Sequence, residues 1–92
     1  MKTKFLLLIT FLSGLVSAHA EPVRVLIWDE RQDRQAEAYD NFLGNEIAKR
    51  LGESAGDIEI RSVGIDDAEQ GLAADNLDWA DVVIWWGHVR QW

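Results

Sequence analysis

Polar and charged side chains follow two strongly apolar runs of this 92-residue chain, and their types are those that bind ligands or move protons. Asp29, Glu30 and Arg31 follow the run Val-Arg-Val-Leu-Ile-Trp, and Gly87 and His88 follow the run Val-Val-Ile-Trp-Trp. Carboxylates and an imidazole together can bind a divalent cation or act as general acid and base. His88 and Glu30 are therefore the candidate catalytic residues.

The same residues are candidates for holding a ligand or a metal ion. A metal ion needs at least three ligands at about 2.0–2.2 Å, and His88 and Asp29 could supply two of them. The candidate substrate-binding residues are Asp29, Arg31, Trp86 and Gly87. The alternative for each is structural: Asp29 caps a loop, Gly87 makes the turn and His88 hydrogen-bonds to backbone. A divalent metal is the one cofactor that these residue types suggest.

Several familiar catalytic patterns are missing from the sequence. No Gly-x-Gly-x-x-Gly follows the first apolar run, and there is no phosphate-binding loop. The Gly-x-Ser-x-Gly pattern of serine hydrolases is missing as well, and the chain has no cysteine. The sequence therefore supplies neither a dinucleotide fingerprint nor a serine-elbow or thiol nucleophile.

The elements that must position these residues alternate between strand and helix patterns. Apolar, β-branched and aromatic residues predict strands at residues 23–28, 57–63 and 81–86. An apolar stripe predicts a helix capped by Asp40 or Asn41 that runs to about Leu51, and a short helix or a turn is expected at residues 72–80. Gly52 suits the C-cap of the first helix.

The order β-α-β-α-β predicts an α/β fold with a parallel sheet and right-handed crossovers. The first strand is the most apolar of the early strands and should lie in the middle, in the strand order 2-1-3. A crevice between the carboxyl ends of strands 1 and 3 would then bring Glu30 near His88. Trp85 and Trp86 must face opposite sides of their strand, so one would pack under a helix while the other could line the crevice and offer a flat face to a sugar ring. Packing in the core is the alternative for each of them.

The first twenty residues have the pattern of a secretory signal peptide. Lys2 and Lys4 precede an apolar stretch at residues 5–12, and an Ala-His-Ala sequence ends at Ala20, where cleavage is expected. A membrane anchor is the alternative, but the apolar stretch falls short of the roughly 20 residues that a spanning helix needs. The pattern predicts a periplasmic or secreted domain formed by residues 21–92.

The composition limits the partners of that domain. Lys2 and Lys4 are two of the 9 Lys and Arg residues, so residues 21–92 keep 7 beside all 16 Asp and Glu, a formal charge of −9. Such acidity makes nucleic acids and anionic membrane surfaces poor partners. With no cysteine there is no disulfide framework, so the chain fits part of a larger core better than a finished mini-protein.

Five segments carry a distinctive combination of residues. They are Val-Leu-Ile-Trp-Asp-Glu at 25–30, Tyr39, Asn-Phe-Leu-Gly-Asn at 41–45, Asp-Asp-Ala-Glu-Gln-Gly-Leu at 66–72 and Asp-Val-Val-Ile-Trp-Trp-Gly-His-Val at 81–89. Together they resemble the trehalose utilisation (ThuA) family over essentially all of residues 22–90. The resemblance implies a class I glutamine amidotransferase-like, flavodoxin-like sheet. It also implies that residues 21–92 are the N-terminal part of a truncated ThuA-like domain.

The resemblance implies a role in the use of trehalose, related disaccharides or oxidised sugars, with a small-molecule sugar as partner. Where the family pattern leads us to expect a second His shortly after His88, this chain has Gln91 and Trp92. The expected function is thus an exported ThuA-like protein with its ligand site at the carboxyl ends of strands 1 and 3. A non-catalytic sugar- or partner-binding module of the same fold and a non-functional fragment are the alternatives, and the oligomeric state stays open.

Overall fold

Three parallel strands form one sheet in the computed structural model, which describes residues 21–90. They are β1 (Val23–Asp29), β2 (Ile58–Gly64) and β3 (Val82–Trp86), in the order β2-β1-β3. The α/β fold class and the strand order 2-1-3 expected from the sequence are therefore confirmed. The signal peptide and its cleavage site fall at residues 1–20, outside the described residues.

β1 lies in the centre because both of its faces are apolar. Val25, Leu26, Ile27 and Trp28 are all buried, although successive side chains of a strand point to opposite faces. Such a continuous apolar run is typical of a strand covered on both sides. β2 alternates between half-buried and exposed positions up to Ser62, as its mixed sequence predicted.

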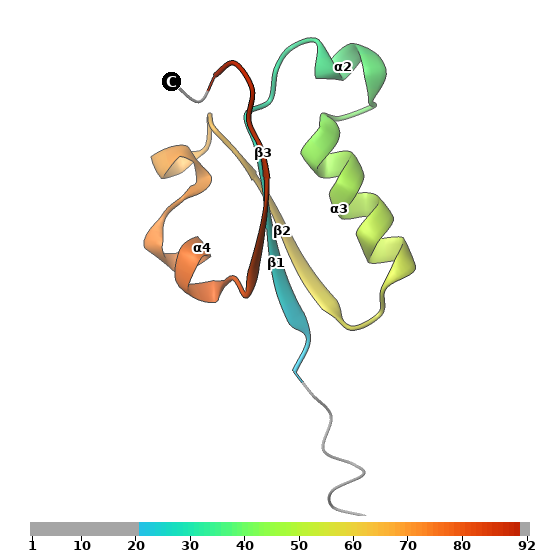
Figure 1. Cartoon of the computed structure of the whole chain (residues 1–92), viewed down its shortest axis with the longest axis vertical. Helices are drawn as coiled ribbons and strands as arrows, with labels where there is room; N and C mark the ends of the chain where they lie inside the picture. Colours follow the sequence, from blue (N-terminus) through green and yellow to red (C-terminus); the bar gives the residue numbers. More distant parts are fainter. Residues whose placement is uncertain (1–20, 91–92) are drawn as a thin grey trace, which may run out of the picture.

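Helices lie on both sides of the sheet, which Figure 1 shows edge-on with α3 and α4 on opposite sides. α3 (Leu43–Ser54) packs on β1 and β2, whereas α4 (Ala74–Trp79) packs on β1 from the other face. A single turn, α2 (Gln35–Ala38), precedes α3, and the 3-10 turn η1 (Ala68–Gly71) precedes α4. The carboxyl ends of β1 and β3 thus meet where the two crossovers diverge, which is the usual ligand position in such sheets.

The start of α3 differs from the expectation that Asp40 or Asn41 would cap it. The helix begins at Leu43, whose N–H donates to the side-chain oxygen of Gln35 at 3.2 Å. The N–H of Gly44 donates to the Asp29 carboxylate at 2.6 Å. The cap is therefore supplied by residues 8 and 15 positions away rather than by the residues that directly precede the helix.

The end of α3 also differs from the expectation. Gly52 does not terminate the helix, which continues to Ser54, with Ala55 at the C-cap. The N–H of Ala55 still donates to the carbonyl of Leu51 at 3.0 Å. A glycine weakens a helix by only about 1 kcal/mol relative to alanine, so packing against the sheet can carry the helix past it.

β3 is much more exposed than its apolar sequence predicted. The exposed fractions of Val82, Val83 and Trp85 are 45%, 45% and 49%, and that of Trp86 is 38%. A continuous apolar run is typical of a strand buried on both faces, but β3 is exposed, because α3 packs on β1 and β2 and no strand within residues 21–90 lies beside the outer edge of β3. No helix in residues 21–90 is long and apolar enough to cross a membrane.

Candidate functional site

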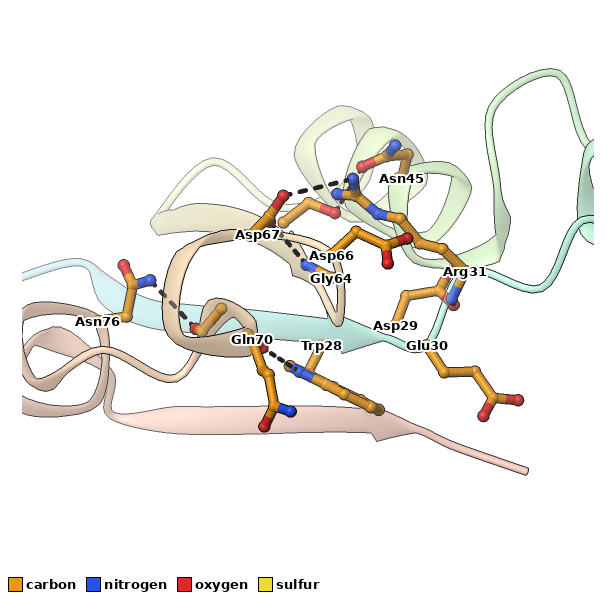
Figure 2. A network of polar contacts seen from close by, with 12 residues as sticks. Trp28, Asp29, Glu30, Arg31, Asn45, Gly64, Asp66, Asp67, Gln70 and Asn76 are labelled. Atoms are coloured by element: carbon orange, nitrogen blue, oxygen red, sulfur yellow. Dashed lines mark hydrogen bonds and ion pairs between the residues drawn. The ribbon is translucent and has the colours of Figure 1, made fainter. Parts of the chain in front are cut away.

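The candidate site lies at the edge of the sheet where the three parallel strands end. Residues 29–31 follow β1, residues 64–67 follow β2, and residues 87–90 follow β3. Side chains that are distant in sequence meet here, as expected for the carboxyl ends of a parallel sheet. Figure 2 shows this edge, with the Asp29 and Glu30 side chains leaving the end of β1 in different directions.

Asp29 is buried and holds the start of α3. Its side chain accepts hydrogen bonds from the N–H of Gly44 at 2.6 Å and from the N–H of Arg31 at 2.7 Å, one on each carboxylate oxygen. A Cβ atom at Gly44 would lie 2.8 Å from the Cβ of Asp29, so the close approach requires glycine. The structure therefore gives Asp29 the capping role that was the alternative to ligand binding.

Glu30 is fully buried and binds the backbone of the segment after β3. Its carboxylate accepts hydrogen bonds from the N–H of Val89 at 2.9 and 3.0 Å and from the N–H of Arg90 at 2.6 Å. The Gln32 side-chain amide donates to the same carboxylate. In the other direction, the N–H of Glu30 donates to the carbonyl of Trp86 at 3.1 Å.

These contacts decide the ionisation of Glu30. Burial by itself would raise the pKa of the carboxyl, but hydrogen bonds from Gln32 and from the backbone of residues 88–90 outweigh it. The net result is a pKa lowered from the ordinary 4.5 to about 2. Glu30 is therefore an anion at neutral pH and cannot serve there as a proton donor.

Arg90, which follows β3, binds residues at the carboxyl ends of β1 and β2. Its guanidinium donates to both oxygens of Asp66, at 2.7 and 3.1 Å, and to the carbonyls of Glu30 and Arg31, both at 3.0 Å. The pairing lowers the pKa of Asp66, chiefly through the hydrogen bond from Arg90. The ends of all three strands are thus joined by one side chain.

Arg31 lies against the end of β2. Its guanidinium is 3.7 Å from the Asp67 carboxylate and 5.9 Å from the centre of the Phe42 ring. Asp67 in turn accepts a hydrogen bond from the N–H of Gly64 at 2.8 Å, a position where a Cβ would collide with the Arg31 side chain (Figure 2). The candidate substrate-binding charge of Arg31 is thereby paired within the protein.

Trp86 and His88 form the exposed aromatic part of this edge. Their ring centroids are 6.5 Å apart and their planes differ by 23°, so the two rings run nearly parallel. Trp86 pairs with Asp29 in the register of the sheet, which puts its side chain on the face that α3 partly covers. Both side chains are exposed, and Gly87 between them carries no side chain that could cover them.

Trp85 occupies the opposite face of β3, as the alternation of strand residues required. Its ring stacks on Trp28 with centroids 3.8 Å apart and 9° between the planes. Trp28 is buried, and its indole N–H donates to the carbonyl of Gln70 at 2.8 Å (Figure 2). Trp85 thus packs on Trp28 on the face of η1, whereas Trp86 lies beside His88, which makes Trp86 the tryptophan of the candidate site.

A metal site is not assembled by the described residues. Within residues 21–90 no group of three His, Cys, Asp or Glu side chains is arranged to hold a metal ion. Both oxygens of Asp29 already accept backbone hydrogen bonds, as do those of Glu30. The donor set at this edge therefore does not fit a divalent cation.

The residues that sequence reasoning overlooked are mostly those that join the strand ends. The sequence predicted no role at the strand ends for Asp66 or Arg90. The one available signal was their position, because each follows a parallel strand by a few residues and such segments meet at one edge. Gln35 and Gly44 gave no signal, since their contacts depend on how α2 folds back toward β1.

Comparisons of the chain with known proteins found no match among family models, curated proteins or solved structures. Inference about function therefore rests on the residues and on the geometry of this edge.

Proposed function

We propose that this chain binds a sugar at the carboxyl ends of β1 and β3, with Trp86 and His88 as the contact surface. In this proposal the protein is an exported, ThuA-like component of trehalose, disaccharide or oxidised-sugar utilisation. The observation that carries the proposal is the exposed, near-parallel pair of aromatic rings at the strand ends. A pyranose ring has an apolar face of C–H groups, which packs on a flat aromatic ring, and hydroxyls that bond to nearby polar groups.

The surroundings of the two rings favour a neutral ligand. Arg31 and Arg90 are paired with Asp67 and Asp66, and the Glu30 carboxylate accepts hydrogen bonds from the backbone. Charges that already have partners offer little to a charged ligand, whereas the aromatic faces and the imidazole remain exposed. A sugar needs no charge for recognition, so it matches this surface better than a phosphate or a nucleotide.

The same contacts favour a binding function over a catalytic one, and catalysis is therefore the second candidate function. Asp29 and Glu30 use their oxygens to hold the backbone, and Glu30 has a pKa of about 2. Of the catalytic candidates, His88 is the exposed one, and an imidazole could move a proton at neutral pH. The proposal has two forms: a non-catalytic sugar-binding module and an enzyme that relies on His88.

The resemblance to the ThuA family supports the choice of sugar. Two segments carry most of it: residues 66–72 begin at this edge of the sheet, just after β2, and residues 81–89 end there, just after β3. The signal-peptide pattern at residues 1–20 places the ligand outside the cytoplasm in this proposal. An external disaccharide or cell-surface glycan is then the natural partner.

The test is a calorimetric titration of the protein with trehalose and with a keto-disaccharide, followed by chromatography of the mixture for products. We expect saturable binding, and Trp86→Ala should weaken it about tenfold because a stacked ring contributes on the order of 1 kcal/mol. Trp85→Ala is the matched control, since that ring lies on the other face of the same strand. Equal loss in both variants, or no binding to the unaltered protein, would refute the proposal. Product formation would separate the enzyme from the module.

A further inference from the structure

We propose that Glu30 is the positioning residue of the aromatic pair: it holds the backbone on both sides of His88 and thereby sets His88 beside Trp86. This inference rests on the proposed sugar site for its purpose, but its geometry can be tested without any sugar.

Glu30 holds the segment after β3 at two points. The first is its own backbone N–H, which donates to the carbonyl of Trp86 at 3.1 Å. The second is its carboxylate, which accepts from the N–H groups of Val89 and Arg90 at 2.6–3.0 Å. His88 lies between these points, so its backbone has little freedom once both sets of bonds are formed.

The carboxylate is suited to this task because several donors converge on it. Successive backbone N–H groups that point to one place form an anion-binding concavity, which usually receives an external anion. Here the anion is an internal side chain that is fully buried. Hydrogen bonds to an ionised group are shorter and stronger than those between neutral groups, so the turn is held firmly.

The side chain of Arg90 supports the same arrangement. The guanidinium of Arg90 donates to the carbonyl of Glu30 and to the carboxylate of Asp66. Arg90 therefore binds Glu30 through both its backbone and its side chain. No such contact with β1 holds the imidazole of His88 itself, which is exposed, so the position of His88 follows from the backbone around it.

The variant Glu30→Gln tests the proposal, because it keeps the size of the side chain but removes the charge and one acceptor oxygen. The matched control is Glu37→Gln, which makes the same change at an exposed position on α2. Two quantities are measured by NMR: the hydrogen-exchange rates of the Val89 and Arg90 amides, and the nuclear Overhauser effects between the rings of His88 and Trp86. Neither measurement requires a ligand.

In the unaltered protein we expect the Val89 and Arg90 amides to be protected from exchange although both residues are exposed. Glu30→Gln should raise their exchange rates by about tenfold or more and remove the ring-to-ring effects. Amides within α3 should keep their rates, and this separates a local positioning role from general loss of structure. Glu37→Gln should change none of these quantities.

The outcomes keep the two proposals apart. Unprotected Val89 and Arg90 amides in the unaltered protein would overturn the positioning role, and this result needs no variant that folds. Nuclear Overhauser effects between the His88 and Trp86 rings that persist in Glu30→Gln would also overturn the positioning role. If the amides and the rings respond as expected but trehalose and the keto-disaccharide do not bind the unaltered protein, the positioning role stands and the sugar site fails. Weaker sugar binding by Glu30→Gln with normal binding by Glu37→Gln supports both.

Discussion

Glu30 shows how a buried charge can be stabilised without an opposite charge in contact with its carboxylate. Its carboxylate is surrounded by N–H donors from the backbone of residues 88–90 and from Gln32. Burying an ionised carboxylate without partners would be very costly, so the donors must be in place whenever the group is buried. This dependence couples the ionisation of one side chain to the folding of the segment after β3.

The pH dependence of the free energy of unfolding should reflect the lowered pKa of Glu30. Its pKa in the folded protein, about 2, lies below the ordinary 4.5, so its contribution is fully present above about pH 4.5 and is lost as the pH falls through 2. We expect Glu30→Gln to lower the free energy of unfolding by about 1–3 kcal/mol at pH 7. The difference from the unaltered protein should shrink between pH 4.5 and 2.

Urea denaturation at pH 7 and at pH 3 measures this prediction. Glu37→Gln, in which an exposed carboxylate is replaced, should follow the unaltered protein at both values. The link to ionisation would be contradicted if the free energy of unfolding of Glu30→Gln lay equally far below that of the unaltered protein at pH 7 and at pH 3.

At the scale of the elements, α3 depends on β1 for its N-terminal cap. The N–H of Gly44 reaches the carboxylate of Asp29 because the glycine allows the helix to come close to the strand end. A negative charge at the start of a helix also interacts favourably with the helix dipole. The contact fixes both the direction of α3 and the geometry of the turn that leads from Asp29 to Arg31.

Two glycines of α3 should therefore respond to alanine in opposite directions. At Gly44 a Cβ would lie 2.8 Å from that of Asp29, so Gly44→Ala should destabilise the protein by about 1–3 kcal/mol. Gly52 is exposed and its nearest contact for a Cβ, on Ile60, is at 3.9 Å. Gly52→Ala should stabilise the protein by up to about 1 kcal/mol through helix propensity.

Thermal denaturation followed by circular dichroism measures both changes. Because the two substitutions are identical and lie in one helix, Gly52→Ala is the control for Gly44→Ala. A stabilising effect of alanine at Gly44 would show that the cap from Asp29 is not required.

At the scale of the whole molecule, the apolar surface is unevenly distributed. β1 is covered on both faces, whereas β3 exposes Val82, Val83 and Trp85 at the edge of the sheet. An exposed, apolar edge strand presents free backbone groups to other chains and favours association. The acidic charge of the chain, −7 overall, opposes such contacts but is absent from β3 itself.

Val83→Lys should reduce the association of the protein at high concentration, measured by static light scattering. The substitution places a charge on the exposed strand, where it interferes with edge-to-edge pairing. It also brings the net charge closer to zero, which by itself would favour association. A decrease in scattering would therefore reflect weaker edge-to-edge pairing of β3 rather than the change in net charge.

Ala74→Lys is the control, because it makes the same change of charge at an exposed position on α4. It should leave the scattering unchanged or raise it slightly. Equal effects of the two substitutions would contradict a role of β3 in association.

The fold could be predicted because it depends on patterns that lie within short stretches of sequence. The apolar run at residues 23–28, interrupted only by Arg24, is typical of a strand buried on both faces, and the alternation of strands and helices implies a parallel sheet. The order 2-1-3 then followed from the handedness of crossovers and from the apolar character of the first strand. The positions of Glu30 and His88 at one edge follow from the same topology.

What the sequence determined by itself was therefore the strands, their order and the placement of Asp29, Glu30 and His88 at the carboxyl ends of β1 and β3. Only the tertiary structure decided which of these residues hold the fold and which remain exposed to a ligand. Glu30 meets Arg90 across 60 positions of sequence and Asp29 meets Gly44 across 15, at distances of 2.6 Å in both cases. Such contacts depend on the relative placement of whole elements to within a fraction of a hydrogen-bond length, and no local pattern of residue types encodes that placement.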